Sequence, residues 1–291
     1  MQVVVKNLNY TYSKNSKSVA VKALKGINLT IEEGEFFGII GETGSGKSTF
    51  IQHLNGLIKT TKEDCECLKI GEFDLTEKKC NYKKLRSKVG MVFQYPEYQL
   101  FAETVEADVM FGLKNCKPEM TEEEKSSAVK KALELVGLNY YEIKDKSPFE
   151  LSGGQKRRVA IAGVLVLEPE VLILDEPAAG LDPKGKRELL KLLKEIHGKT
   201  VKTTVIVSHD MNLIMEECDK VALFHKGNVA KVDAPENIFK DKELVSLCGL
   251  KFPLTASLYH TLKEKGVSLK TNLKVENFIK AVTEYYKGEQ R

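Results

Sequence analysis

Short apolar runs recur along most of the chain and alternate with amphipathic segments of helical period. At residues 1–12 and 24–34 apolar and polar positions alternate, with many β-branched side chains, which predicts half-buried strands. The run "EFFGIIG" at 35–41 is continuously apolar and ends in glycine, as expected of a strand covered on both faces. Similar runs end in "DEP" at 171–177 and in "SHD" at 203–210. Apolar strands separated by helices predict an α/β fold with a mostly parallel, covered sheet.

Helices are expected between these strands and in one long block. The period becomes helical from Lys47 to Leu57, and another helix is expected from Pro183. From about residue 97 to 167 helical patterns dominate, and one of them opens with Thr121 and Glu124, which have the spacing of a capping box. We expect this block to be a helical subdomain inserted into the α/β domain.

The last part of the chain differs in character from the rest. Beyond Asp233 it is lysine-rich and helical in pattern, without further strand signals. We therefore expect an α/β domain over residues 1–236, which contains the inserted subdomain, and an appended helical region over 237–291. The longest apolar runs are far shorter than the ~20 residues of a membrane-spanning helix, and no signal-peptide pattern opens the chain. A membrane role is therefore expected to require partners.

Composition adds few constraints. The chain has 291 residues, of which 42% are hydrophobic and 30% charged, enough for a sizeable core. The formal net charge of +4 is spread along the chain, so it does not indicate a nucleic-acid partner. Six cysteines are scattered, and Cys65 and Cys67 form a C-x-C without a second pair at metal spacing. Free thiols in a reducing cytosol are a better interpretation than a zinc site.

A glycine-rich segment lies between the strand at 35–41 and the helix that starts at Lys47. Its sequence, "GETGSGKST", fits G-x-x-x-x-G-K-[ST] in the strand–turn–helix context that distinguishes a P-loop from a chance glycine-rich turn. Its N–H groups would turn toward phosphate oxygens, Lys47 would reach the β- and γ-phosphates and take part in catalysis, and the Ser48 hydroxyl would bind Mg²⁺. The residues expected to hold the nucleotide here are Gly41, Glu42, Thr43, Gly44, Ser45, Gly46, Lys47, Ser48 and Thr49.

Three polar side chains end the buried strands, at the edge where ligands of open α/β sheets gather. Asp175 and Glu176 end the run at 171–177, and His209 ends the run at 203–210. We expect Asp175 to hold Mg²⁺, Glu176 to orient the attacking water or act as general base, and His209 to contact the γ-phosphate. Two alternatives stay open: the paired carboxylates could cap a helix, and a lone histidine could be structural.

A second anion-binding feature lies in "LSGGQKRRVA", residues 151–160. Ser152 is an N-cap residue, and Gly153 and Gly154 leave the first helical turn without side chains, so an anion can approach its N–H groups. One nucleotide needs only one phosphate cradle, so a second cradle in the same chain needs an explanation.

These motifs, in this order, resemble those of the ATPase subunit of an ATP-binding cassette (ABC) transporter. The resemblance covers roughly residues 1–235 and rests on Gly41–Thr49, Gln94, Leu151–Gln155, Val171–Glu176, Gly180–Asp182 and His209. It implies a P-loop NTPase core with a mostly parallel sheet and an antiparallel β subdomain. In that family two subunits face each other head to tail, and each ATP is held by the P-loop of one and the LSGGQ helix of the other, which explains the two cradles. The residues implied to act in trans are Ser152, Gly153, Gly154, Gln155 and Asp182.

Further positions take roles from the same resemblance. Tyr12 falls where the family places an aromatic residue that stacks on adenine, although an ordinary strand tyrosine is the alternative. Gln94 falls at the glutamine that contacts Mg²⁺ and relays the nucleotide state, so Ser48, Gln94 and Asp175 are the implied metal ligands. Ala178 stands where the family often has threonine, a departure that we expect to matter little.

One segment resembles a narrower group. "QYPEYQLFAETVEADVMFG", residues 94–112, is similar to the segment that contacts the membrane subunit in ATPases of energy-coupling factor (ECF) transporters, importers of vitamins and transition-metal ions. "SPFELSGGQKRRVAIAGVL" and "DEPAAGLDPKG" resemble the second of the two ATPase types in those complexes. The resemblance implies ATP and Mg²⁺ as cofactors and a peripheral position on the cytoplasmic face of the cell membrane. The implied partners are a second ABC ATPase (related or identical), an integral membrane coupling subunit and a substrate-binding membrane subunit, and residues 237–291 would help the ATPases associate.

The side chains after Gln94 indicate how a membrane subunit would be held. One helical stripe with a four-residue repeat is expected to be buried in the helical subdomain: Phe101, Val105, Val109 and Leu113. The groups then left for a groove that receives a helix of the membrane subunit are Tyr95, Pro96, Tyr98 and Leu100. Glu97 and Glu103 would pair with arginines on that helix. Glu97→Lys is therefore expected to uncouple transport while ATP hydrolysis continues.

Two other functions stay as alternatives. A soluble ABC protein that acts on DNA or ribosomes usually has long coiled-coil insertions or two cassettes, and this chain has neither. Its mild charge also disfavours nucleic acid. The ATPase of a conventional ABC importer, which works with a free binding protein, is disfavoured by the segment 95–112.

Overall fold

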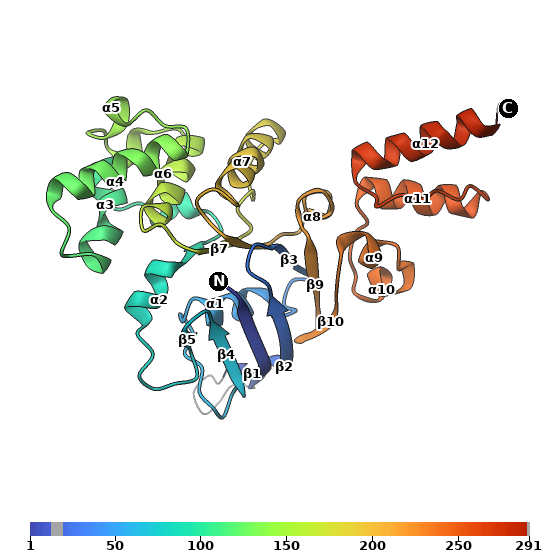
Figure 1. Ribbon diagram of the computed structural model, residues 1–291, viewed down its shortest axis with the longest axis horizontal. Helices are drawn as coiled ribbons and strands as arrows, with labels where there is room; N and C mark the ends of the chain where they lie inside the picture. The colour runs from blue at the N-terminus through green and yellow to red at the C-terminus, as the bar shows by residue number, and fades with distance from the viewer. Residues whose placement is uncertain (13–19, 290–291) are drawn as a thin grey trace.

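The computed structural model describes residues 1–12 and 20–289 and builds two β-sheets with helices around them (Figure 1). The strands are β1 (Val3–Tyr12), β2 (Val21–Ile31), β3 (Phe36–Gly41), β4 (Cys67–Ile70), β5 (Phe73–Asp74), β6 (Val89–Val92), β7 (Val171–Asp175), β8 (Thr203–Val207), β9 (Lys220–His225) and β10 (Asn228–Asp233).

The helices fall into three groups along the chain. Those beside the larger sheet are α1 (Lys47–Leu54), α2 (Tyr82–Lys88), α7 (Pro183–Ile196) and α8 (Met211–Glu217). The central block contains the 3₁₀ turns η1 (Pro96–Gln99) and η2 (Pro148–Glu150) and the helices α3 (Val105–Cys116), α4 (Glu122–Leu135), α5 (Tyr140–Ile143) and α6 (Gly153–Leu165). The C-terminal helices are α9 (Pro235–Phe239), α10 (Lys242–Leu247), α11 (Leu254–Glu264) and α12 (Val275–Glu289).

The larger sheet carries the strands that end in the polar motifs. Its order is β10–β9–β3–β8–β7–β6; it is parallel from β9 to β6, and β10 joins antiparallel at one edge. The smaller sheet, β2–β1–β4–β5, is antiparallel throughout. The expected α/β class, with a mostly parallel sheet and an antiparallel β subdomain, is confirmed.

The larger sheet is covered on both faces by two separate hydrophobic cores. Phe37, Ile173 and Val205 pack toward α1 and the smaller sheet, within one cluster of buried residues. Their neighbours Phe36 and Leu172 point the other way, into a cluster that contains the helical block and α7–α10. Successive strand side chains point to opposite faces, so burial on both sides requires the continuous apolar runs that the sequence has.

Local helix signals are confirmed at several positions. The Thr121 hydroxyl accepts from the Glu124 N–H while the Glu124 carboxylate accepts from the Thr121 N–H, a capping box. The helix that was expected to reach Leu57 ends earlier, at Leu54, and Gly56 beyond it has a φ of +67°.

Helices α3–α6 stand at one end of the molecule and α9–α12 at the other (Figure 1). Helices α3–α6 lie within the range expected for the inserted subdomain and α10–α12 within that of the extension, whereas α9 begins before it, at Pro235. The boundaries stay predictions. All six cysteines are free thiols. No helix in the described part of the chain combines the length and the apolar character that crossing a bilayer requires.

Candidate nucleotide-binding site

The glycine-rich turn between β3 and α1 is tightly built. Gly46 has a φ of +104°, and a Cβ placed on it would lie 2.7 Å from the carbonyl oxygen of Ala23. Only glycine adopts this backbone there without strain and collision. The Lys47 Nζ atom is buried and donates to the carbonyl oxygens of Gly41 and Glu42, at 2.8 Å each. Burial lowers the pKa of Lys47, although nearby carboxylates oppose that effect.

Two carboxylates end β7 beside this turn. The Asp175 side chain hydrogen-bonds with that of Ser48, but burial is the larger effect and raises the pKa of Asp175. Glu176 has a left-handed backbone with a φ of +49°, and its N–H donates to the Val207 carbonyl at 3.0 Å. Burial likewise raises the pKa of Glu176, and the negative charge of Asp175 adds to the increase. Neither carboxylate caps a helix, which excludes the alternative that the pair is only a cap.

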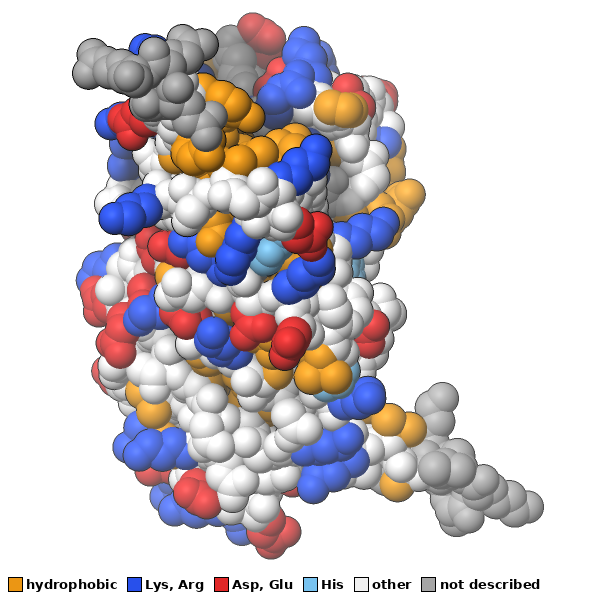
Figure 2. Space-filling view, turned by 90° about the vertical axis from the view of Figure 1, so that its right-hand side faces the viewer, with side chains coloured by type: hydrophobic (Ala, Val, Ile, Leu, Met, Phe, Trp, Pro, Cys, Tyr) orange, Lys and Arg blue, Asp and Glu red, His pale blue; other side chains and the backbone are white. Residues whose placement is uncertain are grey.

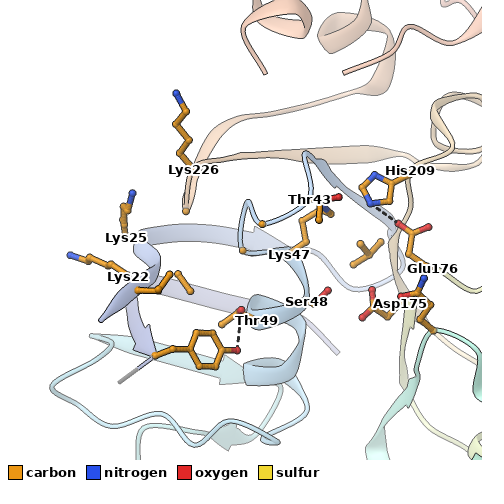
Figure 3. A pocket seen from close by; sticks show the side chains of 18 residues that line it. Lys22, Lys25, Thr43, Lys47, Ser48, Thr49, Asp175, Glu176, His209 and Lys226 are labelled. Carbon is orange, nitrogen blue, oxygen red and sulfur yellow. Dashed lines mark hydrogen bonds and ion pairs between the residues drawn. The ribbon is translucent and has the colours of Figure 1, made fainter. Parts of the chain in front are cut away.

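His209 and Glu176 point toward each other across the sheet edge (Figure 3). The Nε2 atom of His209 lies 3.5 Å from the Oε1 atom of Glu176. Burial and the positive charge of Lys47 lower the pKa of His209, which disfavours the charged ring and weakens the contact as an ion pair. Glu176 Oε1 is buried and accepts no hydrogen bond from the described residues, so it can accept one from a water or ligand.

A single cavity of about 820 Å³ joins these groups, within the size range of small-molecule sites. Tyr12 borders it, with its ring partly exposed and its hydroxyl 3.2 Å from Thr49 Oγ1. Three lysines that were not predicted as site residues lie at the rim opposite Asp175, Glu176 and His209: Lys22, Lys25 and Lys226 (Figure 3). The expected site residues in the lining are Tyr12, Thr43, Gly44, Gly46, Lys47, Ser48, Thr49, Gln94, Asp175, Glu176 and His209.

The donor set in this cavity fits Mg²⁺. Ser48, Gln94 and Asp175 all line it and offer a hydroxyl, an amide oxygen and one carboxylate. Mg²⁺ takes oxygen ligands and is held by one or two carboxylates together with substrate phosphates rather than by an all-protein cage. The described residues contain no group of three or more His, Cys, Asp and Glu that could hold a metal alone.

The second expected cradle lies elsewhere. Residues 152–155 do not line the cavity. Ser152 and Gln155 form a capping box at the start of α6, and added Cβ atoms on Gly153 and Gly154 would meet nothing within 4 Å in the described chain. Asp182 is also outside the cavity, where its Oδ1 caps α7 by accepting from the Gly185 N–H at 2.9 Å. The structure therefore separates the expected residues into two places.

The segment after Gln94 differs from expectation. Val105, Val109 and Leu113 are buried as expected, but Phe101 is 60% exposed because α3 begins only after Thr104, its N-cap. Pro96 and Leu100, expected in a surface groove, are buried. The exposed aromatic groups there are Tyr95, Tyr98, Phe101 and Phe111, and the last was not singled out from the sequence.

The clearest departure from expectation is the partner of Glu97. Both of its carboxylate oxygens accept from the buried Arg157 of α6, at 2.7 and 2.9 Å. The expectation that Glu97 awaits an arginine of another subunit is therefore wrong, and with it the basis for using Glu97→Lys as a selective change. Arg157 was missed because it is 60 residues away in the sequence.

The chain is similar to known ATPases over nearly its whole length. The family described as "ABC transporter" matches residues 24–179. A protein from Caldanaerobacter subterraneus called energy-coupling factor transporter ATP-binding protein EcfA2 is 46% identical, over 99% of both chains. A protein of the same name from Clostridium tetani is 46% identical over 94% of this chain and 93% of its own.

Solved structures agree with these relatives. The structure of cbiO1 from Clostridium perfringens, part of the ABC transporter complex cbiONQ, superposes with a TM-score of 0.70 at 39% identity and covers 89% of this chain and 98% of its own. The cassette MJ0796, in a dimeric post-hydrolysis state with ADP and Pi, gives 0.69 at 31% identity and covers 80% of this chain and 98% of its own.

Proposed function

This chain belongs to the ABC transporter family, among the ATP-binding subunits of ECF transporters, and from that premise we propose that its P-loop and the LSGGQ helix of a second ABC ATPase enclose one ATP. ATP hydrolysis that powers membrane transport is the function of this family and of this chain. One observation carries the proposal: Ser152–Gln155 lie outside the cavity that holds the P-loop, while the first turn of α6 is bare. A nucleotide in that cavity therefore has no second cradle from the same copy.

The P-loop end is proposed to hold the phosphates. The N–H groups of the turn and the start of α1 favour negative charge, and Lys47 would exchange its two carbonyl partners for phosphate oxygens. Ser48, Gln94 and Asp175 would hold Mg²⁺, which neutralises charge on the phosphates when it is bound. Tyr12 is exposed enough on one face to stack on adenine.

Glu176 is proposed to orient the attacking water and accept its proton. Its Oε1 atom has no hydrogen-bond donor among the described residues, and burial raises its pKa, which makes the carboxylate a better base. His209, 3.5 Å away, is proposed to donate to the γ-phosphate, and its lowered pKa disfavours an ion pair with Glu176. Lys186 and Asp210, which form an ion pair, join the start of α7 to the loop after β8 and steady this edge.

A membrane subunit is proposed to dock on the exposed aromatic surface after Gln94. Tyr98 is 84% exposed, and Phe101 and Phe111 stack edge to face with their ring centroids 4.9 Å apart. Large apolar groups on a surface favour a macromolecular contact, and an amphipathic helix of the membrane subunit is the partner that we propose for this surface. Docked in this way, the chain would lie on the cytoplasmic face of the membrane, in an importer of vitamins or transition-metal ions with a substrate-binding membrane subunit.

The C-terminal helices are proposed to contact the second ATPase. Figure 2 faces this end of the molecule and shows hydrophobic side chains gathered near its top, where α11 and α12 lie. The exposed apolar residues of these two helices are Leu254, Leu258, Val275, Ile279 and Tyr286. Asp182 is proposed to contact the same partner in trans. Capping of α7 engages its Oδ1 atom, so its other carboxylate oxygen can accept from the partner.

Two substitutions at Gly154 test the sandwich. An added Cβ meets nothing there, so the fold should accept both Gly154→Ala and Gly154→Asp. Gly154→Asp places a carboxylate where the phosphates of a partner-bound ATP would approach. ATP binding by the isolated chain should stay unchanged, while turnover by the purified transporter falls about 10²–10³-fold, the usual cost of losing one oxyanion donor.

Gly154→Ala is the matched control and should have a much smaller effect on turnover. The proposal fails if Gly154→Asp leaves turnover near normal. It also fails if Gly154→Asp weakens ATP binding by the isolated chain as strongly as Lys47→Ala does, because the two cradles would then serve one nucleotide within one copy.

A further inference from the structure

Arg157 of α6 is a buried cation that joins three separate segments of the chain. Only 3% of the residue is exposed. Its Nε and Nη2 atoms donate to the two carboxylate oxygens of Glu97, at 2.9 and 2.7 Å, a bidentate pair. Its Nη1 atom donates to the carbonyl oxygens of Ala179 at 2.9 Å and Pro177 at 3.3 Å. A buried guanidinium needs such partners, and a planar fork fixes their relative positions.

The three segments have different surroundings. Glu97 lies in η1, next to the exposed Tyr95 and Tyr98 of the aromatic surface. Pro177 and Ala179 follow Glu176 directly in the chain and lead to Asp182. Arg157 itself is one turn beyond the LSGGQ start of α6. One side chain therefore connects the aromatic surface, the loop beside the candidate base and the second cradle.

A second contact joins the same two loops without Arg157. The Tyr95 ring packs on Gly180, where an added Cβ would lie 3.2 Å from a ring carbon. Tyr95 and Glu176 both have left-handed backbones, with φ of +55° and +49°, which ordinary residues hold only when their surroundings enforce it. The segments 95–97 and 176–180 are thus fixed against each other on two sides.

We propose that Arg157 is a positioning residue that makes η1 and the loop 177–182 move as one body, so that a membrane subunit docked on the aromatic surface sets the position of Glu176 and of the loop that faces the second ATPase. The inference rests on the proposed docking surface. An alternative role, packing alone, would leave the two surfaces energetically independent once the fold is intact.

The bidentate contact with Glu97 also explains why position 157 needs an arginine. A lysine at 157 keeps the charge but is a point donor without a planar fork, so it cannot hold both oxygens of Glu97 and the two carbonyls together. Arg158, its neighbour, differs in its partners: it donates to the Val136 carbonyl at 2.8 Å and to Glu188 at 3.2 Å. Arg158→Lys is therefore a matched control on the same helix.

The test measures coupling between two binding events and needs no knowledge of the cargo. ATP affinity is determined for the ATPase pair alone and for the pair bound to the co-purified membrane coupling subunit in nanodiscs, in a Glu176→Gln background that slows hydrolysis. The ratio of the two affinities is the coupling factor, typically about 5–150-fold in coupled proteins. We expect such a ratio in the parent protein and in Arg158→Lys.

Glu97→Gln and Arg157→Lys should bring that ratio close to one while the affinity of the free pair for ATP stays unchanged. Amide hydrogen exchange gives a local readout: docking of the membrane subunit should alter exchange at 177–182 in the parent protein and in Arg158→Lys but not in Glu97→Gln. Glu97→Gln is a neutral isostere, so it keeps the test valid if Arg157→Lys does not fold.

Three results would overturn the inference. The first is a parent protein without coupling, and the second is an undiminished ratio in Glu97→Gln. The third is a loss of ATP affinity that is as large in the free variant pairs as in the pairs bound to the membrane subunit, which indicates a packing role. Failure of the proposed function appears differently, as a parent ATPase pair that does not bind ATP or does not bind the membrane subunit at all.

Discussion

The two glycine-rich helix starts of this chain look alike in sequence and differ in structure. At the P-loop, Gly46 is pressed against the Ala23 carbonyl, and Lys47 is buried and donates to two carbonyl oxygens. At the start of α6, Gly153 and Gly154 have empty space around them within the described chain, and the cap formed by Ser152 and Gln155 is exposed. The P-loop is held in place by contacts within its own chain. The start of α6 offers N–H groups that its own chain does not use. Such a difference is expected when one half of a site is completed by another molecule.

The largest effect is expected from a change at Glu176, which should slow hydrolysis while ATP binding continues. Glu176→Gln keeps the size of the side chain but removes its basicity, so ATP turnover by the transporter should fall about 10²–10⁴-fold. ATP should remain bound and hold the ATPase pair closed. Native mass spectrometry in the presence of ATP would detect this ATP-bound pair. Turnover near the parent rate would mean that Glu176 is not the base.

Alanine at the two glycine-rich ends compares them directly. Gly46→Ala meets both a left-handed φ and the Ala23 carbonyl, and such strain costs about 1–3 kcal/mol. We expect the isolated chain to lose about tenfold or more in ATP affinity, since about 1.4 kcal/mol is a factor of ten. Gly154→Ala should leave that affinity unchanged. Isothermal titration with ATP measures both, and equal losses would contradict the comparison.

The crowding of the P-loop extends to the C-terminal helices. Gly249, with a φ of +61°, lies so close to Glu42 that an added Cβ would collide with its carboxylate, whereas Gly266, with a φ of +86°, has open space. Gly249→Ala and Gly266→Ala share backbone strain, so the difference in their free energies of unfolding reports the collision. Glu42 is exposed and its carboxylate can turn aside, so we expect an interaction energy at the low end of the usual range of about 0.5–3 kcal/mol between positions 42 and 249.

A double variant identifies the source of that energy. Glu42→Ala combined with Gly249→Ala should remove the excess destabilisation, because the colliding carboxylate is gone. Chemical denaturation of the four proteins gives the cycle. If Glu42→Ala does not relieve Gly249→Ala, the strain lies in the backbone alone and the C-terminal helices do not press on the P-loop.

The smallest expected effect concerns pH and the helix behind the P-loop. His53 of α1 is fully buried, its Nδ1–H donates to the Thr49 carbonyl at 2.8 Å, and burial lowers its pKa. The unfolded chain therefore binds a proton at His53 near pH 6.5, the ordinary value, before the folded chain does, so stability is lost as pH falls below that value.

His53→Gln should flatten this pH dependence, by at most about 1.4 kcal/mol per pH unit for one group. Thermal unfolding between pH 5 and 8 measures the slope, and His225→Gln, at the half-buried end of β9, serves as the matched histidine substitution. An unchanged slope in His53→Gln would assign the acid sensitivity to other groups.

Sequence reasoning succeeded where a motif lies within one stretch of chain. The P-loop, the pair Asp175 and Glu176, and His209 each end a strand, and parallel strands bring their carboxyl ends to one edge. The roles of these residues stay predictions, but their convergence on one cavity was predictable from pattern alone.

Two expectations failed, one at the local start of a helix and one at a contact between distant segments. The four-residue repeat was extended back to Phe101, beyond the N-cap Thr104 at which the helix begins, so Phe101 is exposed. Glu97 has an exposed-looking sequence context, but its partner Arg157 is brought to it only by the packing of α6 on η1. A pair of opposite charges in separate helical segments carries no periodic signal, so a single sequence does not reveal it.

The alternation of the two cores across the larger sheet has a consequence for how this molecule can vary. Phe36 and Phe37, like Leu172 and Ile173, belong to different cores, so sliding β3 or β7 by one residue would send every side chain to the wrong side. The same slip would also move Asp175 away from the cavity that it lines. Insertions and deletions are therefore tolerable in the connecting loops but not in these strands, where the same alignment serves both folding and hydrolysis.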